Sequence, residues 1–457
     1  MSISYTEIIN HQKEFFQSGK TNYVEFRIES LKRLKRTILS RYDDIADAIK
    51  KDMHKCDFEI FTTEVMGVLD EINLAVKHLH SWVKPLKAKT PLVHFKARSQ
   101  IYHEPYGVSL IISAWNYPFQ IAINPVIGAI AAGNCCIIKP SELAPNTARI
   151  ITKIIEESFV KEHCTVIEGG VDETTKLLEE RFDFIHYTGN SRVGRIIAQA
   201  AAKNLTPVIL ELGGKSPCIV DATANIEVSA RRIVWGKFLN AGQTCVAPDY
   251  LLVHKSIKER LIKAIVKQIE IFYGKNPENS KDFGRIINQR HFDRLSVLLN
   301  NGKVTAGGRT NKEKLYIEPT IIEHLTWDAP IMKEEIFGPI LPVLEYSTID
   351  EVISMVNAKE KPLALYYFSK DKNNISRISK EAHFGGGCIN TTVIHTSNPH
   401  LPFGGIGESG MGSYHGKWSF EAFSHKKSMI KKSFIIDPKL IYPPYKNKIS
   451  IVKKMYL

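Results

Sequence analysis

Cys245 is the side chain of this sequence best suited to act as a nucleophile. It lies in NAGQTCVAPDY, residues 240–250, a run of small and polar residues between a predicted helix over 226–239 and a predicted strand over 250–254. A thiol on such a loop can reach a substrate and attack it as the thiolate, whereas a structural cysteine usually has aliphatic neighbours and is inert. The segment therefore indicates covalent chemistry at Cys245, with an inert thiol as the alternative.

Two further polar residues each end a run of apolar strand residues. Glu211, in LELGGKSP (210–217), is a carboxylate at the end of a buried strand, which costs free energy unless it is paired or used. It fits a general base with a raised pKa, or an ion-paired strand end. Asn116, in SAWNYPF (113–119), fits a donor to a developing oxyanion, or a side chain that holds the turn before Pro118.

Other motifs for nucleotides and metals are out of context. Gly405, Gly407 and Gly410 spell GxGxxG, but SNPHLP precedes them in place of the strand that a dinucleotide fingerprint needs. The GKS of residues 214–216 resembles the end of a P-loop that lacks its upstream glycine. No CxxC pair or Cys/His cluster has the spacing of zinc ligands, so we expect no metal site.

The elements that must position these residues alternate between strand and helix. Short aliphatic runs predict buried strands, and apolar residues at helical spacing predict the helices between them. The predicted strands are 106–113, 135–139, 165–167, 182–187, 207–211, 216–220, 250–254 and 364–368, and the predicted helices are 24–52, 64–83, 124–132, 146–157, 192–202, 226–239 and 256–273. Aliphatic strands that alternate with helices are typical of covered parallel sheets, so we predict an α/β fold.

The net charge of +13 is concentrated at the C-terminus. Residues 424–457 contain nine Lys and a single acid, Asp437, which leaves +5 for the other 423 residues. The excess is therefore a property of the tail and not of a basic domain face, and we expect no nucleic-acid partner. A tail of this kind is compatible with weak peripheral contact with anionic lipid, with a subunit contact, or with a solvated terminus.

Cysteine usage and the absence of targeting signals predict a cytoplasmic protein. The seven Cys are scattered, which fits a reducing compartment, and the N-terminus has no signal-peptide pattern. Residues 105–138 carry no charge, but Asn, Gln and Pro interrupt the stretch every few residues, so buried strands and a helix are expected in place of a membrane span.

Seven motifs, taken together and in order, resemble the aldehyde dehydrogenase superfamily. They are SAWNYPF, KPSELAP, YTGNSRVG, ELGGKSP, GQTCVAPDY, EEIFGP and PFGGIGESGMGSYHGKWSF. The similarity covers roughly residues 20–430, and the compact N-terminus and the closing GSYHGKWSFEAFSHKK particularly resemble the class 3 branch of fatty and aromatic aldehyde dehydrogenases.

The resemblance implies roles for the residues of the reaction itself. Cys245 matches the nucleophile, Glu211 the general base, and Asn116 the oxyanion donor that acts beside the Cys245 backbone N–H. It also implies NAD or NADP as cofactor, bound through a turn that this family uses in place of GxGxxG. The matching cofactor residues are Lys139 and Glu142 at the adenosine ribose, Gly189, Ser191 and Gly194 at the pyrophosphate, Glu335 at the nicotinamide ribose, and Phe337 nearby.

The implied reaction is oxidation of an aldehyde to a carboxylic acid through a Cys245 thiohemiacetal and thioester. Trp115, Tyr117 and Phe119 could form an aromatic tunnel that favours medium-chain, long-chain or aromatic aldehydes, or they could be ordinary core residues. A CoA-acylating enzyme is the first alternative, although Glu211 favours hydrolysis. A catalytically silent protein that binds lipid or RNA through its tail is the second.

The resemblance also implies a domain organisation with two Rossmann-like parallel sheets and a small β element. We expect a dinucleotide-binding domain from 1–83 and 104–210 and a catalytic domain from 211–390. A bridging or oligomerisation element would combine 84–103 with 391–457, including the basic tail, and the class 3 likeness favours a homodimer.

Overall fold

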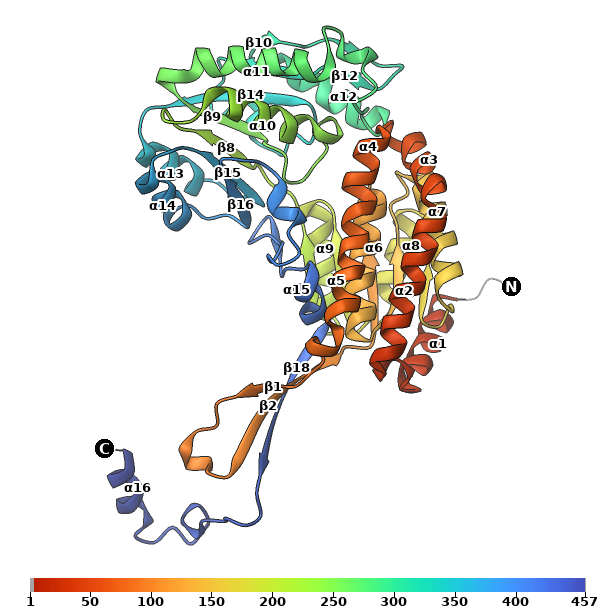
Figure 1. Cartoon of the computed structure of the whole chain (residues 1–457), viewed down its shortest axis with the longest axis vertical. Coiled ribbons are helices and arrows are strands. Elements are labelled where there is room, and N and C mark those ends of the chain that lie inside the picture. The colour runs from red at the N-terminus through yellow and green to blue at the C-terminus, as the bar shows by residue number, and fades with distance from the viewer. Residues whose placement is uncertain (1–3, 457) are drawn as a thin grey trace.

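The structure, a computed structural model, describes residues 4–456 (Figure 1). Two parallel sheets, each covered by helices, form the body of the molecule, and a thin antiparallel arm projects from it. The α/β fold expected from the sequence, with two Rossmann-like sheets and a small β element, is confirmed.

The first sheet has six strands in the order β17-β7-β6-β3-β4-β5, all parallel to their neighbours except β17. Its strands are β3 (Val108–Ile112), β4 (Cys135–Lys139), β5 (Cys164–Val166), β6 (Phe184–Thr188), β7 (Val208–Glu211) and β17 (Gly410–Met411). The chain leaves β3 for β4 on one side and later returns to β6 on the other. The end of β3 is therefore the topological switch point, where ligands bind in open α/β sheets, and it leads directly into the turn of Asn116.

The helices of this half pack around an unusually apolar central helix, α6. They are α1 (Tyr5–Gln17), α2 (Val24–Ser40), α3 (Tyr42–Met53), α4 (Asp57–Ile60), α5 (Met66–Trp82), α6 (Pro118–Ala132), α7 (Pro145–Ser158), α8 (Val171–Glu179) and α9 (Ser191–Ala202), with a π-helical turn at Phe61–Val65. Helix α6 contacts β3 and β4 on one side and α2, α5 and α15 (Gly416–Ala422) on the other, so it is buried all round. No helix in the described part of the chain is long and apolar enough to cross a membrane.

The second sheet has seven strands in the order β10-β13-β14-β9-β8-β15-β16. Its strands are β8 (Pro217–Val220), β9 (Tyr250–His254), β10 (Lys303–Ala306), β13 (Thr320–Glu323), β14 (Ile340–Tyr346), β15 (Ala364–Phe368) and β16 (Gly386–Ile389), beside a small hairpin of β11 (Thr310–Asn311) and β12 (Tyr316–Ile317). Its helices are α10 (Ile226–Phe238), α11 (Lys258–Tyr273), α12 (Gln289–Leu298), α13 (Ile349–Asn357) and α14 (Lys372–Glu381). Within the seven-stranded sheet, all strand pairs are parallel except β10 with β13.

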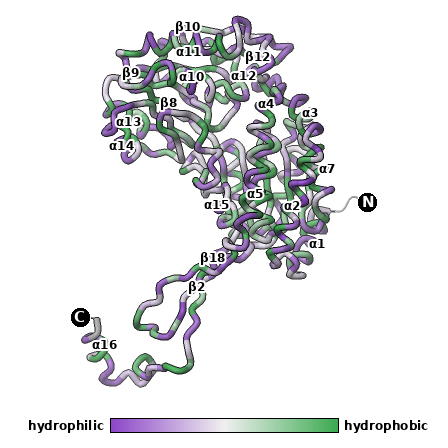
Figure 2. Tube along the Cα trace, in the orientation of Figure 1, coloured by the Kyte–Doolittle hydropathy of each residue, from purple (hydrophilic) through white to green (hydrophobic). Residues whose placement is uncertain are grey.

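The arm is a three-stranded antiparallel sheet in the order β1-β2-β18, with β1 at Leu86–Ala88, β2 at Ala97–Pro105 and β18 at Ser424–Lys432. It carries the C-terminal tail, which ends in helix α16 (Lys448–Tyr456), away from the body (Figure 1). Hydrophobic and hydrophilic residues alternate along this part of the trace (Figure 2). After Ser424 every residue of β18 is exposed.

The structure differs from the sequence predictions in three places. The helix predicted over 124–132 begins six residues earlier, at Pro118. The helix predicted over 24–52 is two helices, because Arg41 leaves helical geometry and its guanidinium pairs with Glu157 on α7 and Asp44 on α3. The segment 391–457, assigned to the bridging element, is divided. Strand β17 adds to the edge of β7 and α15 packs on α5 and α6, so only the chain from Ser424 onward continues into the arm.

Asn134 joins the first sheet to the root of the arm, and its removal should destabilise the protein. Its side chain is completely buried, accepts from the Gly107 N–H at 2.9 Å and donates to the Phe423 carbonyl at 2.9 Å. We expect Asn134→Ala to lower the free energy of unfolding in urea by about 2–4 kcal/mol, because both backbone groups lose their partner. The exposed Asn204→Ala is the control, and an equal effect of the two variants would contradict this interpretation.

Candidate active site

Cys245 lies on the irregular loop between α10 and β9. After the helix, Asn240 and Ala241 both have a φ of 52°, a left-handed turn that redirects the chain. Gly242 follows with a φ of 76°, and a Cβ there would lie 2.3 Å from the Gly338 carbonyl oxygen, so only glycine allows this close approach. The loop is thereby packed against the segment of Gly338, and Cys245 stays partly exposed.

The surroundings of Cys245 disfavour its thiolate. Burial raises the pKa of the thiol, and the negative charges of Glu335 and Glu211 raise it further. The backbone N–H groups of Cys245 and Val246 act in the opposite direction, because they donate toward the sulfur. The resting group is therefore a thiol that must lose its proton before it can attack an electrophile.

Glu211, the last residue of β7, is a buried carboxylate without compensation. Among the described residues, neither of its side-chain oxygens has a hydrogen-bond partner. Burial raises the pKa of Glu211 well above its ordinary value. Its backbone pairs with Gly410 of β17 and accepts from the Gly189 N–H at 2.9 Å, so the sheet fixes the backbone of Glu211 while its carboxyl group makes no hydrogen bond.

Asn116 lies beside the loop of Cys245. It is buried at the turn between β3 and α6, and its Nδ2 donates to the carbonyl of Gln243 at 3.2 Å, two residues before the thiol. An amide nitrogen carries two hydrogens, so a second remains for an oxygen in the site. Asn116 thus lies against the loop of Cys245, and Glu211 is near enough for its charge to act on the same thiol, although the three residues lie far apart in the sequence.

The turn after β6 leads into the start of α9. Asn190 caps this helix by accepting from the Val193 N–H at 3.0 Å, and the first N–H groups of the helix are left without intrahelical acceptors. Gly189 and Gly194 permit close packing, since a Cβ at Gly194 would lie 2.8 Å from a Leu212 side-chain carbon. Ser191 points elsewhere, because its Oγ donates to the Glu408 carbonyl at 2.9 Å. Free N–H groups at the start of a helix are of the kind that can bind an anion.

Lys139 ends β4 and Glu142 follows it, at the same edge of the first sheet. The Lys139 side chain is buried and donates from Nζ to the Pro140 carbonyl at 2.8 Å and to Glu142 Oε2 at 3.3 Å. The Glu142 carboxylate remains largely exposed and can accept further hydrogen bonds. Glu142 can therefore contact a ligand that extends along the carboxyl ends of the strands, and the buried Lys139 holds its carboxylate.

Glu335 and Phe337 approach the site from the turn before β14. A Cβ at Gly213 would lie 2.0 Å from a Glu335 carboxylate oxygen, which places Glu335 against the segment that follows Glu211. Burial, followed by the charge of Asp249, raises the pKa of Glu335 to about 8. Phe337 meets Trp115 edge to face, with ring centroids 5.3 Å apart.

The three aromatic residues proposed for a substrate tunnel have different surroundings. Trp115 is partly exposed between Phe337 and His291. Tyr117 is buried, and its hydroxyl shares a hydrogen bond of 2.6 Å with Thr244, next to Cys245. The side chain of Phe119 is completely buried in the core, because the first turn of α6 directs it inward, so the expectation that it lines a pocket is not met.

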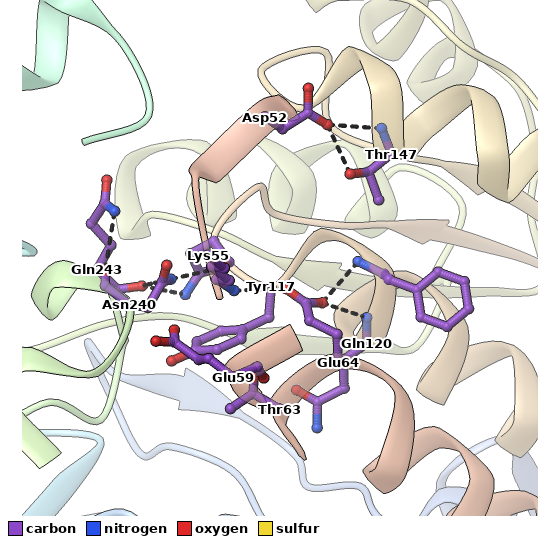
Figure 3. A network of polar contacts seen from close by, with 12 residues as sticks. Asp52, Lys55, Glu59, Thr63, Glu64, Tyr117, Gln120, Thr147, Asn240 and Gln243 are labelled. Atoms are coloured by element: carbon purple, nitrogen blue, oxygen red, sulfur yellow. Dashed lines mark hydrogen bonds and ion pairs between the residues drawn. The ribbon is translucent and has the colours of Figure 1, made fainter. Parts of the chain in front are cut away.

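Sequence reasoning missed a polar network that lies beneath these residues (Figure 3). Lys55, Glu64, Asn240 and Gln243 are all buried and connect to Asn116 by hydrogen bonds. Lys55 and Glu64 carry no local signal, because the backbone groups that they hold, the Asn116 carbonyl and the Phe119 N–H, are more than 50 residues away. The described residues contain no group of three or more His, Cys, Asp or Glu side chains that could hold a metal ion.

Comparisons with known proteins decide the family. The sequence model described as "Aldehyde dehydrogenase family" matches residues 4–429. The chain belongs to the aldehyde dehydrogenase family. It is 50% identical to 4,4'-diaponeurosporen-aldehyde dehydrogenase of Staphylococcus aureus, over 97% of each chain, and 45% identical to the dimeric NADP-preferring aldehyde dehydrogenase of Canis lupus familiaris, over 96% of this chain and 97% of that one.

The comparison with solved structures supports the same family. A structure of Staphylococcus aureus AldH in its substrate-bound state matches with a TM-score of 0.97 and 49% identity, over 100% of both chains. The resemblance inferred from the seven sequence motifs is confirmed, and the protein is an aldehyde dehydrogenase, an oxidoreductase.

Glu211 should weaken the fold of this aldehyde dehydrogenase at high pH. Its folded-state pKa is raised, so the neutral form is favoured in the fold, and stability is lost as the pH rises from the unfolded pKa toward the folded one. We expect Glu211→Gln, which stays neutral, to raise Tm by about 2 °C at pH 8, with a smaller difference at pH 5. Melting curves at both pH values test this, with the exposed Glu179→Gln as control; a pH-independent difference would refute it.

Proposed function

We propose that this aldehyde dehydrogenase oxidises an aldehyde to the carboxylic acid with NAD or NADP, through a thioester on Cys245 that is hydrolysed with Glu211 as base. The observation that carries the proposal is the convergence of a thiol, an uncompensated carboxylate and an amide donor at one place. Each of the three has the chemistry that one step of this reaction needs.

The first step is attack of the Cys245 thiolate on the aldehyde carbon. A C–S bond forms, the C=O double bond opens, and the oxygen becomes an oxyanion. The free Asn116 hydrogen and the Cys245 backbone N–H donate to that oxygen. Loss of one such donor typically raises the barrier by about 2.7–4 kcal/mol.

A dinucleotide fits the residues around the site. The start of α9, with Gly189 and Gly194, would take the pyrophosphate, and Ser191 would contribute its backbone N–H, because its Oγ is bonded to the Glu408 carbonyl. The exposed Glu142 with Lys139 would take the adenosine ribose. Glu335 would hold the nicotinamide ribose beside Phe337. When bound, NAD(P) accepts the hydride that leaves the thiohemiacetal carbon as the C=O bond re-forms.

Glu211 then completes the reaction by removing a proton from water. The water oxygen attacks the thioester carbon, the C–S bond breaks, and the acid is released, while the proton taken up by Glu211 passes to the Cys245 sulfur and restores the thiol. A carboxyl group with a raised pKa is a stronger base than an ordinary glutamate once it is ionised, which suits this step. Glu211 therefore favours hydrolysis over transfer of the acyl group to CoA.

The substrate class rests on the aromatic residues near the thiol. Trp115 contacts Phe337, which we place near the nicotinamide, and Tyr117 contacts Thr244, next to Cys245. Because aromatic side chains favour apolar substrates, we propose a medium-chain, long-chain or aromatic aldehyde. The staphylococcal relative is named for 4,4'-diaponeurosporen-aldehyde, so that compound belongs in the substrate panel.

Steady-state and rapid kinetics test the reaction. Across short, long-chain, aromatic and acidic aldehydes, with NAD or NADP and with or without CoA, we expect NAD(P)H formation without CoA and none in Cys245→Ala.

Glu211→Gln should give about one equivalent of NAD(P)H per site and then stall, because the thioester accumulates. Wild-type kcat should rise with pH, since Glu211 and Cys245, both with raised pKa, act in their ionised forms.

Other outcomes would redirect the assignment. Turnover only with CoA would mean an acylating enzyme in which Glu211 is not the hydrolytic base. Folded, reduced protein that oxidises no aldehyde would support a silent binding protein.

We further propose that the enzyme is a cytoplasmic homodimer assembled through the arm. Strand β18 is an edge strand with Met429 and Ile430 exposed, and such an edge invites pairing with a second copy. The relative from Canis lupus familiaris is named as dimeric. Beyond the arm, the tail exposes Phe434 and Ile435 among its lysines, which is the composition of a weak peripheral contact with anionic membranes.

A chain that ends at Ser433 separates the two proposals. It keeps β18, so light scattering after size-exclusion chromatography should still give a dimer. Flotation with anionic vesicles should fall by about tenfold relative to the full chain, because four of the nine C-terminal lysines remain but Phe434 and Ile435 are removed. A monomeric full-length chain would refute the dimer, and equal flotation of both chains would refute the membrane contact.

A further inference from the structure

A buried ion pair between Lys55 and Glu64 contacts the turn of Asn116, and Figure 3 shows the two side chains near Tyr117. Lys55 follows α3, and Glu64 lies in the π-helical turn at Phe61–Val65. The Nζ and Oε1 atoms are 2.7 Å apart, and both side chains are completely buried. Burying two charges costs free energy that their attraction does not reliably recover, so general stability is a poor explanation for such a pair.

The remaining hydrogen bonds of the pair all go to the Asn116 turn. Lys55 Nζ donates to the Asn116 carbonyl at 3.0 Å, and the ammonium group lies 4.0 Å from the centre of the Tyr117 ring. Glu64 Oε2 accepts from the N–H groups of Phe119 and Gln120, both at 3.1 Å. Helix α6 has no side-chain cap of its own, so Glu64 supplies it from a distant segment.

Asn240 connects this turn to the loop of Cys245. Its Nδ2 donates to the Asn116 carbonyl at 2.7 Å and to the Gln243 carbonyl at 3.0 Å. The Gln243 carbonyl also accepts from Asn116 Nδ2, which closes a ring of hydrogen bonds. Gln243 is itself anchored, since its side chain donates to the Arg285 carbonyl at 2.9 Å and accepts from the Ile287 N–H at 3.0 Å.

We propose that Lys55, Glu64 and Asn240 are positioning residues for the reaction. They hold the backbone of Asn116 from below, and so keep its side-chain amide at a fixed place relative to Cys245. An oxyanion donor must be held within about 0.5 Å of its productive position, which one hydrogen bond from a turn does not ensure. The inference rests on the proposed oxyanion role of Asn116, and it assigns no contact between the three residues and the substrate.

A mutant cycle with Asn116→Ala tests the inference. Lys55→Met/Glu64→Gln removes both charges of the pair together and keeps an oxygen for the α6 cap. The buried Glu59 loses the Lys55 charge that lowers its pKa, so its neutral form is favoured in this variant. We expect this double variant to lower kcat about tenfold or more, and Asn116→Ala to lower it about 100-fold. The triple variant should match Asn116→Ala within about twofold, because residues that act through one donor are not additive.

Two further measurements exclude a general loosening of the site. The rate of Cys245 alkylation by iodoacetamide should be unchanged in the double variant, since that substitution forms no oxyanion. Asp52→Asn is the matched control, because Asp52 caps α7 through the N–H groups of Asn146 and Thr147 as Glu64 caps α6 (Figure 3). It should lower Tm and leave kcat within about twofold of wild type.

Asn240→Gly provides an independent variant if the charge-neutral pair does not fold. Glycine tolerates the φ of 52° and removes the amide that bridges the two carbonyls, so kcat should fall in the same way and again without effect in the Asn116→Ala background. A wild-type kcat in the folded variants, or losses that multiply with that of Asn116→Ala, would overturn the positioning role. A wild-type kcat in Asn116→Ala would overturn the oxyanion assignment, and the positioning role with it.

Discussion

The hydrogen bond from the Asn116 amide to the Gln243 carbonyl joins the half of the enzyme that contains the six-stranded sheet to the half that contains the seven-stranded sheet, at the candidate active site. The donor belongs to the turn at the switch point of the six-stranded sheet, and the acceptor belongs to the loop that enters the seven-stranded one. Because Asn240 and Lys55 also hold the Asn116 carbonyl, this contact is made by a rigid set of groups. The position of Cys245 follows from it, since the thiol lies two residues farther along the same loop.

The chemistry of the site depends on charges that the fold leaves uncompensated. Glu211 is buried without a hydrogen-bond partner among the described residues, and its charge and that of Glu335 both disfavour the Cys245 thiolate. An arrangement of this kind lowers the stability of the fold, and it is the arrangement that a general base and a proton-dependent nucleophile need. The Lys55–Glu64 pair differs from it, because all of its charge is matched and all of its bonds serve the neighbouring backbone.

The arm and tail differ from the body in which residues they bury and expose. The two sheets bury aliphatic strands on both faces, whereas β18 and the chain beyond it expose apolar and basic residues together. A surface of that composition on an edge strand fits the subunit and membrane contacts proposed for the arm and tail, and most of the positive charge of the sequence lies there.

Most of what is local in this protein could be predicted from its sequence. The aliphatic runs of β4 and β9 predicted their bounds, since burial on both faces leaves a continuous apolar signal, and the motifs around Cys245, Glu211 and Asn116 identified the family. What depended on distant contacts could not be predicted. Arg41 breaks a helix to meet Glu157, and β17 returns to the first sheet.

The tertiary structure alone decided the immediate environment of the site residues. Phe119 proved to be core, because the orientation of α6 and not its residue type decides what it faces. Lys55 and Glu64 became visible only when segments more than 50 residues apart met, since a buried charge in a helical stretch has the same sequence signature as an exposed one. The sequence by itself determined which chemical groups the protein carries, and the packing of the two sheets determined which of them touch.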